Sequence, residues 1–349
     1  MTILIFIAVL AILILVHEWG HFIAAKKAGL TVEEFGFGFP PRIFSWKSGE
    51  TVYSLNLLPL GGFVKIMGED GSEIKNSKSF SSKPVWIRGL ITINGVAMNF
   101  LLAVFLLIIG FYIGLPQGLD EKTKSVAKNI QIQVVAINHA SPAEQNGIKL
   151  GDSIKNFTEI SALQEFINKN KGKEIILEVQ RGQEILKIKA IPRMNPPEGE
   201  GALGVALVKT GIVSYPWYQS IWLGIKSSFM VTWEIIKGFA GLIKNLIVSG
   251  KVPQEISGPV GIAVLTGQAA NLGFVYLLQL VALISLNLTV LNLLPIPALD
   301  GGRLLFLGIE KIKGSKVNPK VENWIHSIGL ALLLLLAVLI TWRDILRLN

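Results

Sequence analysis

The stretch that decides the fold is ILIFIAVLAILILVHEWGHFIAA, which occupies residues 3–25. A run of this length is long enough to cross about 30 Å of hydrocarbon as a helix. No positive charge precedes the run and no small-residue cleavage site follows it, which favours a retained helix over a signal peptide. Its ionisable residues gather in one string, His17-Glu-Trp-Gly-His21. The sequence therefore predicts a transmembrane helix with three ionisable groups inside it.

The spacing of the two histidines indicates a metal site. Residues four apart lie on one face of a helix, so the imidazoles of His17 and His21 can hold one ion. Glu18 is one step further round the helix, within reach of a metal-bound water. This is the HExxH pattern of zinc hydrolases.

A structural alternative is a polar trio that forms hydrogen bonds between helices. Ionisable groups at mid-bilayer cost roughly 3 kcal/mol each on insertion scales. A bound zinc ion, with apparent affinities on the order of 10 kcal/mol in peptide sites, offsets that cost. The pattern therefore favours the metal site.

A catalytic zinc site usually has three protein ligands, so a third is expected in the membrane body. Asp300 lies in the run Asn292-Leu-Leu-Pro-Ile-Pro-Ala-Leu-Asp-Gly-Gly302. The two prolines end or kink a helix, and broken backbone at membrane depth is tolerated where it lines a cavity. By itself, Asp300 suits a cap on the following turn equally well. Combined with His17 and His21, ligation is the better explanation. The remaining histidines are His139, in a polar insert, and His326, at the start of the last span.

Composition supports a membrane protein. Of the 349 residues, 51% are hydrophobic and only 16% are charged, well below the usual share for soluble domains. The net charge of +9 is spread over loops next to the spans, as the positive-inside rule predicts, so nucleic acid is not expected as a partner. There are no cysteines, which excludes disulfides and thiolate metal ligands.

Three further stretches are long enough to span a bilayer, at about 90–115, 272–294 and 324–342. Basic residues follow the first span, precede the second and separate the last two; they are Lys26, Lys27, Lys83, Arg88, Lys311, Lys313, Lys316 and Lys320. After the second span, Asp120, Glu121, Lys122 and Lys124 roughly cancel. This pattern puts loops 26–88 and 300–323 in the cytoplasm and the 120–200 region outside, although Arg343 and Arg347 run against it.

Segments between the spans show sequence patterns that differ from those of the spans. Residues 51–57 alternate as a strand does, and the paired glycines Gly61 and Gly62 then permit a bend or a close backbone approach. Residues 120–200 predict a compact α+β module, with strands at 130–136, 174–180 and 184–190 and a short helix at 163–168. Residues 217–248 are apolar but carry charges at roughly helical spacing. An interfacial amphipathic helix is favoured there over a fifth span.

The pairing of His17-Glu-Trp-Gly-His21 with Asn292…Leu299-Asp-Gly301 resembles the site-2 protease family of intramembrane zinc metalloproteases. The resemblance extends through Gly61-Gly62-Phe63, Ser257-Gly-Pro-Val-Gly261 and residues 304–313, and so covers nearly the whole chain. The insert resembles a PDZ domain, and Gly147-Ile…Gly151-Asp152 is its most specific string. The nearest branch is that of the bacterial regulator of sigma-E protease, in a form with a single PDZ region.

The resemblance implies a mainly α-helical multi-pass membrane protein of about four transmembrane helices. It would also hold a small membrane-associated β-structure and an inserted α+β PDZ-like domain. The corresponding division is a first half of the membrane core at 1–118, a PDZ-like domain at 119–205, a linker helix at 206–256 and a second half of the core at 257–349.

The resemblance also implies the roles of the site residues. His17, His21 and Asp300 would bind Zn²⁺, and Glu18 would be the catalytic acid and base. Substrate would contact Asn292 and the segment Gly61-Gly62-Phe63.

The same resemblance implies the reaction and the partners. The substrates would be membrane proteins cut within or near a transmembrane helix, such as anti-sigma factors or signal-peptide remnants. The expected location is the bacterial inner membrane, with the active site towards the cytoplasm. The PDZ-like domain would lie outside the cytoplasm and bind peptide C-termini or a substrate ectodomain.

Two departures from the family pattern are present. Some relatives have two PDZ modules where this chain has one. Residues 94–99 read Asn-Gly-Val-Ala-Met-Asn, whereas many relatives have a Gly-Pro pair before the asparagine, so packing around Asn99 is open.

Two other function classes fit parts of the sequence. An inactive membrane scaffold would use the PDZ-like module to bind partners, but the intact Glu18 argues against it. An ion transporter would use Glu18 and Asp300 as a relay, but the chain lacks the repeat symmetry of transporters.

Overall fold

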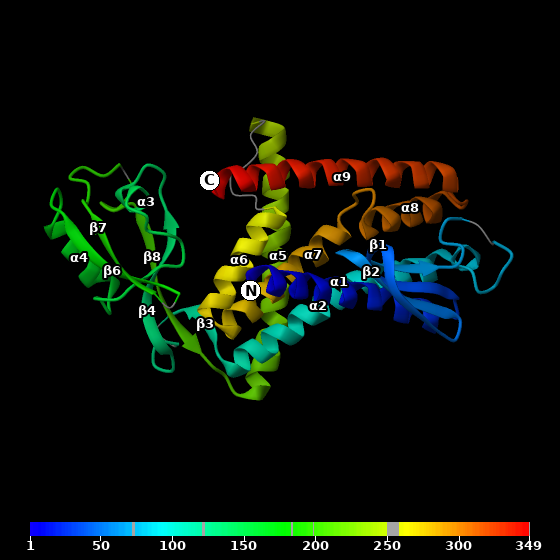
Figure 1. Ribbon diagram of the computed structural model, residues 1–349, viewed down its shortest axis with the longest axis horizontal. Coiled ribbons are helices and arrows are strands. Elements are labelled where there is room, and N and C mark those ends of the chain that lie inside the picture. The colour runs from blue at the N-terminus through cyan, green and yellow to red at the C-terminus, as the bar shows by residue number, and fades with distance from the viewer. Residues whose placement is uncertain (72–73, 121–122, 183, 198, 250–257, 349) are drawn as a thin grey trace. The chain divides into compact units, whose positions relative to one another are not determined.

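The computed structural model describes the chain apart from residues 72–73, 121–122, 183, 198, 250–257 and 349 (Figure 1). Glu121, Lys122 and Ser257, which entered the sequence predictions, lie outside the described residues. Two compact units are present. The membrane unit comprises residues 1–107, 223–267 and 280–349, and the insert unit comprises 108–222 and 268–279.

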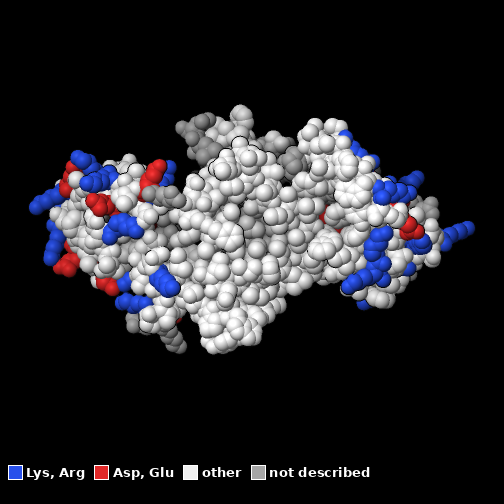
Figure 2. All heavy atoms as spheres, turned by 60° about the horizontal axis from the view of Figure 1, so that its bottom comes forward, with Lys and Arg blue, Asp and Glu red and all other residues white. Residues whose placement is uncertain are grey.

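Among the described residues, four helices are long and apolar enough to cross a membrane, as predicted: α1 (Thr2–Lys27), α2 (Val85–Ile113), α7 (Phe274–Leu293) and α9 (Pro319–Leu348). The predicted spans begin about five residues after the starts of α2 and α9. Arg88 interrupts the first turn of α2, and the first turns of α9 are polar, so neither start belongs to the continuous apolar run. Pro84 precedes α2 and Pro319 opens α9, positions that suit a residue without an N–H. The face drawn in Figure 2 is uncharged over the spans of the membrane unit, and the Lys and Arg side chains visible on this unit lie at one end of that face. The protein is a membrane protein.

Small residues bring α1 and α2 close together. Gly20 of α1 is buried, and a Cβ there would lie 2.8 Å from Met98 Cγ of α2. Gly95 of α2 lies against the ring of His21 in the same way. Such close approach of small residues is how helices pack without a hydrophobic driving force in lipid.

The loop between α1 and α2 forms a sheet from two long strands, β1 (Val32–Ser48) and β2 (Thr51–Ile66). Residues 34–37 of β1 pair on both sides, with residues 62–65 and with residues 52–55 of β2. In the described part of the chain, residues 62–66 pair with β1 on one side only, so they form an edge of this sheet. A short 3-10 helix, η1 (Phe80–Ser82), leads into α2.

The predicted break after the third span is confirmed. Helix α7 ends at Leu293, and a turn closed by bonds from Ile296 N to Leu294 O and from Leu299 N to Ile296 O leads into α8 (Asp300–Lys313). Gly302 permits this tight path, because a Cβ there would lie 3.0 Å from the carbonyl carbon of Ile296. The turn delivers Asp300 at the first position of α8.

Helix α5 (Trp217–Ser249) is not one of the described helices that are long and apolar enough to cross a membrane. Within the membrane unit it runs steeply across the direction of α1 and α9 (Figure 1), and Phe229 packs against Phe100 of α2 at 5.0 Å between ring centroids. Helix α6 (Pro259–Leu272) follows. Its first turn is held by Asp344 of α9, whose Oδ2 accepts from Gly258 N and Gly261 N at 2.9 and 2.8 Å.

The insert unit contains a six-stranded sheet with the order β3-β8-β4-β5-β6-β7. Its strands are β3 (Leu115–Gly118), β4 (Lys128–Ile137), β5 (Ser153–Ile154), β6 (Ile175–Arg181), β7 (Glu184–Ala190) and β8 (Val205–Val213). Helices α3 (Pro142–Gln145) and α4 (Ile160–Lys169) complete the unit. The predicted strands and short helix are confirmed, and the sheet extends beyond 119–205 at both ends because β3 pairs with the end of β8.

The insert unit has its own hydrophobic core, which includes Ile132, Leu163 and Val179. The turn before β5 is fixed by Asp152, which is 1% exposed and accepts from Lys149 N and from Arg181 at 2.7–2.8 Å. This pairing raises the pKa of the Arg181 guanidinium. The insert unit thus has a core of its own and hydrogen-bond partners for its buried carboxylate, as an independent module does.

Candidate metal centre

Three side chains from two distant parts of the sequence meet in the membrane unit. His17 Nε2 lies 3.1 Å from Asp300 Oδ2, His21 Nε2 lies 3.4 Å from the same oxygen, and the two Nε2 atoms are 3.2 Å apart. The histidines come from one face of α1, as their spacing predicted, and Asp300 comes from the start of α8. The two side chains in each ion pair are only 13% and 15% exposed.

The Asp300 carboxylate faces the histidines rather than capping its own helix. Leu299 is the N-cap of α8, and this helix start has no side-chain cap hydrogen bond. A carboxylate in the first turn also interacts favourably with the helix dipole.

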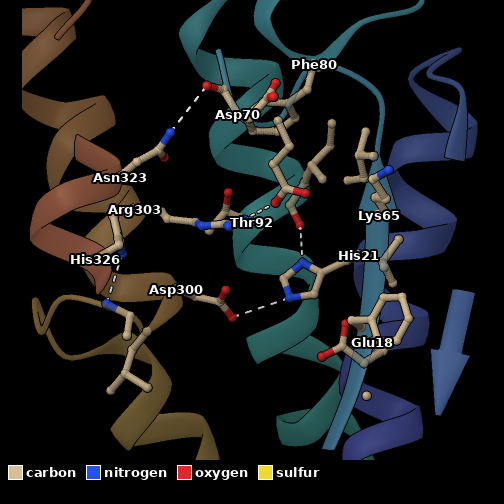
Figure 3. Close-up of a pocket in the computed structure, with 18 of the residues that line it drawn as sticks. Glu18, His21, Lys65, Asp70, Phe80, Thr92, Asp300, Arg303, Asn323 and His326 are labelled. Carbon is tan, nitrogen blue, oxygen red and sulfur yellow. Dashed lines mark hydrogen bonds and ion pairs between the residues drawn. The ribbon is translucent and has the colours of Figure 1, made fainter. Parts of the chain in front are cut away.

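The ring of His21 is oriented by α2. Its Nδ1 donates to the backbone oxygen of Ile91 at 2.9 Å, which leaves the Nε2 lone pair free and aimed at Asp300 (Figure 3). Ligating histidines usually have such a partner on the second ring nitrogen. His17 Nδ1 is buried and has no hydrogen-bond partner among the described residues. The sequence had no signal for the Ile91 contact, because it is a tertiary contact to a backbone atom.

The three atoms fit a zinc ion. A tetrahedral site with bonds of about 2.0–2.1 Å has ligand atoms roughly 3.3–3.4 Å apart. The observed separations of 3.1, 3.2 and 3.4 Å match the face of such a tetrahedron. Asp300 Oδ2 is buried and has no conventional hydrogen-bond partner among the described residues, which suits an oxygen that binds a cation. Two neutral imidazoles and one carboxylate form a donor set typical of catalytic zinc.

A cavity of about 950 Å³ opens beside these atoms. Glu18 lines it, and Figure 3 shows the Glu18 carboxylate beside His21 on the cavity side of α1. Of the residues expected to contact substrate, Asn292, Gly62 and Phe63 line the cavity. Gly61 is not among the lining residues, because it packs against the ring of Phe39.

The β-sheet edge passes directly over the candidate base. A Cβ on Gly62 would lie 2.7 Å from Ile14 Cγ2 and 3.0 Å from Glu18 Cγ, so only glycine fits here without displacement. Residues 62–67 all line the cavity. The close backbone approach predicted for the paired glycines is therefore confirmed at Gly62.

Arg303 of α8 and Glu69, which form an ion pair, both line the cavity. A second ion pair, Arg88 of α2 with Glu310 of α8, lines a smaller cavity. His326 of α9 also lines the larger cavity. A histidine within a span was the signal available for His326. His139 lies in the insert unit, where its side chain is 95% exposed and pairs with Glu144.

Comparison with known proteins shows the family of the chain. The family model described as peptidase family M50 matches residues 5–336. The protein named zinc metalloprotease RasP of Oceanobacillus iheyensis is 30% identical, with 99% of each chain covered. The regulator of sigma-W protease RasP of Bacillus subtilis is 31% identical, with 99% of each chain covered. A Clostridium acetobutylicum protein is 34% identical, with 97% of this chain and 96% of its own covered.

These relatives fall into two lengths. The alignment with the Oceanobacillus protein spans 438 positions against 349 residues in this chain, so at least 89 positions have no counterpart here. The alignment with the Clostridium protein spans 346 positions. The chain belongs to peptidase family M50 and is an intramembrane zinc metalloprotease of the site-2 type.

Proposed function

We propose that His17 Nε2, His21 Nε2 and Asp300 Oδ2 bind the catalytic zinc and that Glu18 is the general base and acid. The observation that carries this proposal is the near-equilateral triangle of 3.1–3.4 Å formed by one atom from each of three partly buried side chains. Glu18 supports it, because Glu18 follows a ligand by one residue and lines the same cavity without belonging to the triangle.

The chemistry follows from these positions. A zinc ion held by His17, His21 and Asp300 would supply Lewis acidity and make a water more acidic. Glu18 would take a proton from the water whose oxygen attacks the scissile carbonyl carbon. Glu18 then gives the proton to the amine that leaves when the C–N bond breaks. An intact carboxylate in this position disfavours the inactive-scaffold alternative.

The substrates of a site-2-type protease are membrane proteins. Because the backbone carbonyls of a transmembrane helix are hydrogen-bonded within the helix, the helix must unwind before they are accessible. We place the unwound segment along residues 62–66, where it pairs as an added strand. Two observations support this assignment. Residues 62–66 line the cavity and pair with β1 on one side only, and Gly62 lies against the Glu18 side chain. Asn292, which lines the same cavity at the end of α7, is placed to hydrogen-bond a substrate carbonyl.

The insert is assigned as a single PDZ-like module that screens substrates by their ectodomains or C-termini. In the described chain, residues 205–208 of β8 pair with β4 alone, whereas residues 210–213 pair with β3. Leu163 and Ile167 of α4 share the core with residues of β8. A peptide added beside residues 205–208 therefore lies next to α4. The 89 or more positions found only in the longer relatives are enough for a further module of this size.

The orientation is assigned from charge and from the number of spans. Four spans and the lysines of loops 26–88 and 300–323 put the end of α1 and the start of α8 on the cytoplasmic side of a bacterial inner membrane, and the module on the opposite side. Helix α5 is assigned to the interface. Its lysines at 226, 237 and 244 are exposed and fall on one stripe of the helix, flanked by exposed Trp222 and Trp233.

The test compares wild type, Glu18→Gln and Asp300→Ala in detergent with a tagged transmembrane substrate. Glu18→Gln should retain about one zinc per chain while turnover falls by about 10² or more, the usual scale for loss of a general base. Asp300→Ala, like His17→Ala and His21→Ala, should lose zinc. Equal cleavage by Glu18→Gln and wild type would remove Glu18 from the mechanism. Full zinc in Asp300→Ala would remove Asp300 from the ligand set.

A further inference from the structure

The backbone that leads into Asp300 is held in an uncommon conformation. Ala298, two residues earlier, has a φ of +74°. The left-handed region is sparsely populated by residues with a Cβ, so the surrounding structure must stabilise it. The structure therefore needs a contact at Ala298 that favours this conformation.

That contact comes from α9. The backbone N–H of Ala298 donates to His326 Nδ1 at 2.9 Å (Figure 3). Because Nδ1 accepts, the neutral ring carries its proton on Nε2. The same ring packs against Phe306 of α8, with ring centroids 5.5 Å apart. His326 therefore joins the turn, α8 and α9 at one point.

A second contact one helical turn further along α9 holds the same segment. Gly329 is buried, and a Cβ there would lie 2.8 Å from the carbonyl oxygen of Pro297. Only 6% of the span window of α9 is buried, so this helix makes few contacts along its length. The segment just before Asp300 is one of the places where α9 is in contact, and the start of α6, held by Asp344, is another.

We infer that His326 is a positioning residue of the metal centre: its Nδ1 holds Ala298 in the left-handed conformation and thereby aims Asp300 Oδ2 at the two histidine nitrogens. This inference rests on the ligand set proposed above. Helix α9 contributes no ligand, but through His326 it has a role in the zinc site. His326 acts on the backbone of Ala298 and not on the substrate.

Two substitutions separate the nitrogens of the ring. In His326→Asn, the side-chain oxygen occupies the place of Nδ1 and can still accept from Ala298 N–H. In His326→Gln, the amide reaches the place of Nε2 and leaves Ala298 unsupported. His326→Leu removes both functions. His139→Leu is the matched control, because it removes an exposed histidine from the insert unit.

Zinc dissociation constants are measured on the full-length chains in detergent by competition with a chromophoric chelator. Loss of a residue that orients a ligand typically weakens metal binding by about 10–100-fold, and this is the rise expected for His326→Leu and His326→Gln. His326→Asn and His139→Leu should bind zinc as wild type does. Thermal unfolding checks that each chain is folded, and if the Leu variant is not, the Asn and Gln pair carries the test.

Three results would overturn the inference: wild-type zinc affinity in His326→Gln, equal rescue by Asn and Gln, or no rescue by Asn. Asp300→Ala is measured in parallel. Undiminished zinc affinity in Asp300→Ala would contradict the ligand set itself. Weakened binding in Asp300→Ala with no effect of His326→Gln would contradict only the role of His326.

Discussion

The contact between Gly95 and His21 makes a sharp prediction about the metal centre. In Gly95→Ala, the new Cβ would lie only 2.5 Å from Cε1 and 2.8 Å from Cδ2 of the His21 ring. Carbon atoms pack at about 3.5 Å or more, so the ring must retreat by roughly 1 Å or the helices must separate by that amount. Metal–ligand distances tolerate only about 0.2 Å, so either movement disrupts ligation by Nε2.

The expected effect is large on function and small on folding. A misplacement of about 1 Å can cost roughly 10²-fold in rate, and we expect Gly95→Ala to lose at least that much turnover and to bind zinc more weakly. Overpacking costs about 1–3 kcal/mol, while exchanging glycine for alanine in a helix gains about 1 kcal/mol, so the chain should remain folded.

The matched control lies on the same helix. In Gly89→Ala, the nearest atom to the new Cβ is Leu304 Cδ2 at 4.0 Å, which is ordinary contact. Zinc affinity by chelator competition and cleavage of a tagged transmembrane substrate are measured for both variants. Wild-type zinc affinity and turnover in Gly95→Ala would refute the argument, as would equal losses in Gly89→Ala.

Two further predictions concern the sheet edge and the insert. In Gly62→Ala, the new Cβ should displace the Glu18 side chain and lower turnover, while zinc content stays at the wild-type level. The control Gly308→Ala, with open space around its Cβ, should keep wild-type turnover and zinc content. Loss of zinc in Gly62→Ala would contradict this reasoning. Arg181→Leu leaves the buried carboxylate of Asp152 without its cation and should destabilise the insert by about 2 kcal/mol, as a lower unfolding temperature by calorimetry, with zinc content unchanged. An unaltered unfolding profile would show that the pair contributes little.

The metal-binding face of α1 was predictable because it depends on local geometry. His17 and His21 are four residues apart, and helical periodicity alone puts them on one face. Asp300 was predictable only in combination, since its position before Gly301 fits a cap as well as a ligand. The cap bond is absent at the start of α8, and this single observation favours ligation.

The contacts that orient the ligands were not predictable from the sequence. Gly95, the backbone oxygen of Ile91 and His326 act through tertiary contacts that follow no local pattern. The sheet between α1 and α2 was also only partly predicted. The outer part of β1 does not show the alternation of polar and apolar residues that marks a strand. Its apolar side chains do not face a protein core, since Phe39, Ile43, Phe44 and Trp46 are all exposed.

The distance in sequence between the ligands has a consequence for biogenesis. Asp300 follows His21 by 279 residues, and ribosomes add about 5–20 residues per second, so roughly 15–55 s separate the synthesis of the two residues. With the proposed ligand set, a nascent chain holds Glu18 in the bilayer during that interval with only two zinc ligands beside it. Hydrolytic capacity then arises only after the third span has been inserted and its broken end has folded. Chains stalled on the ribosome before residue 300 should therefore fail to retain zinc against a chelator, whereas chains released in full should retain it.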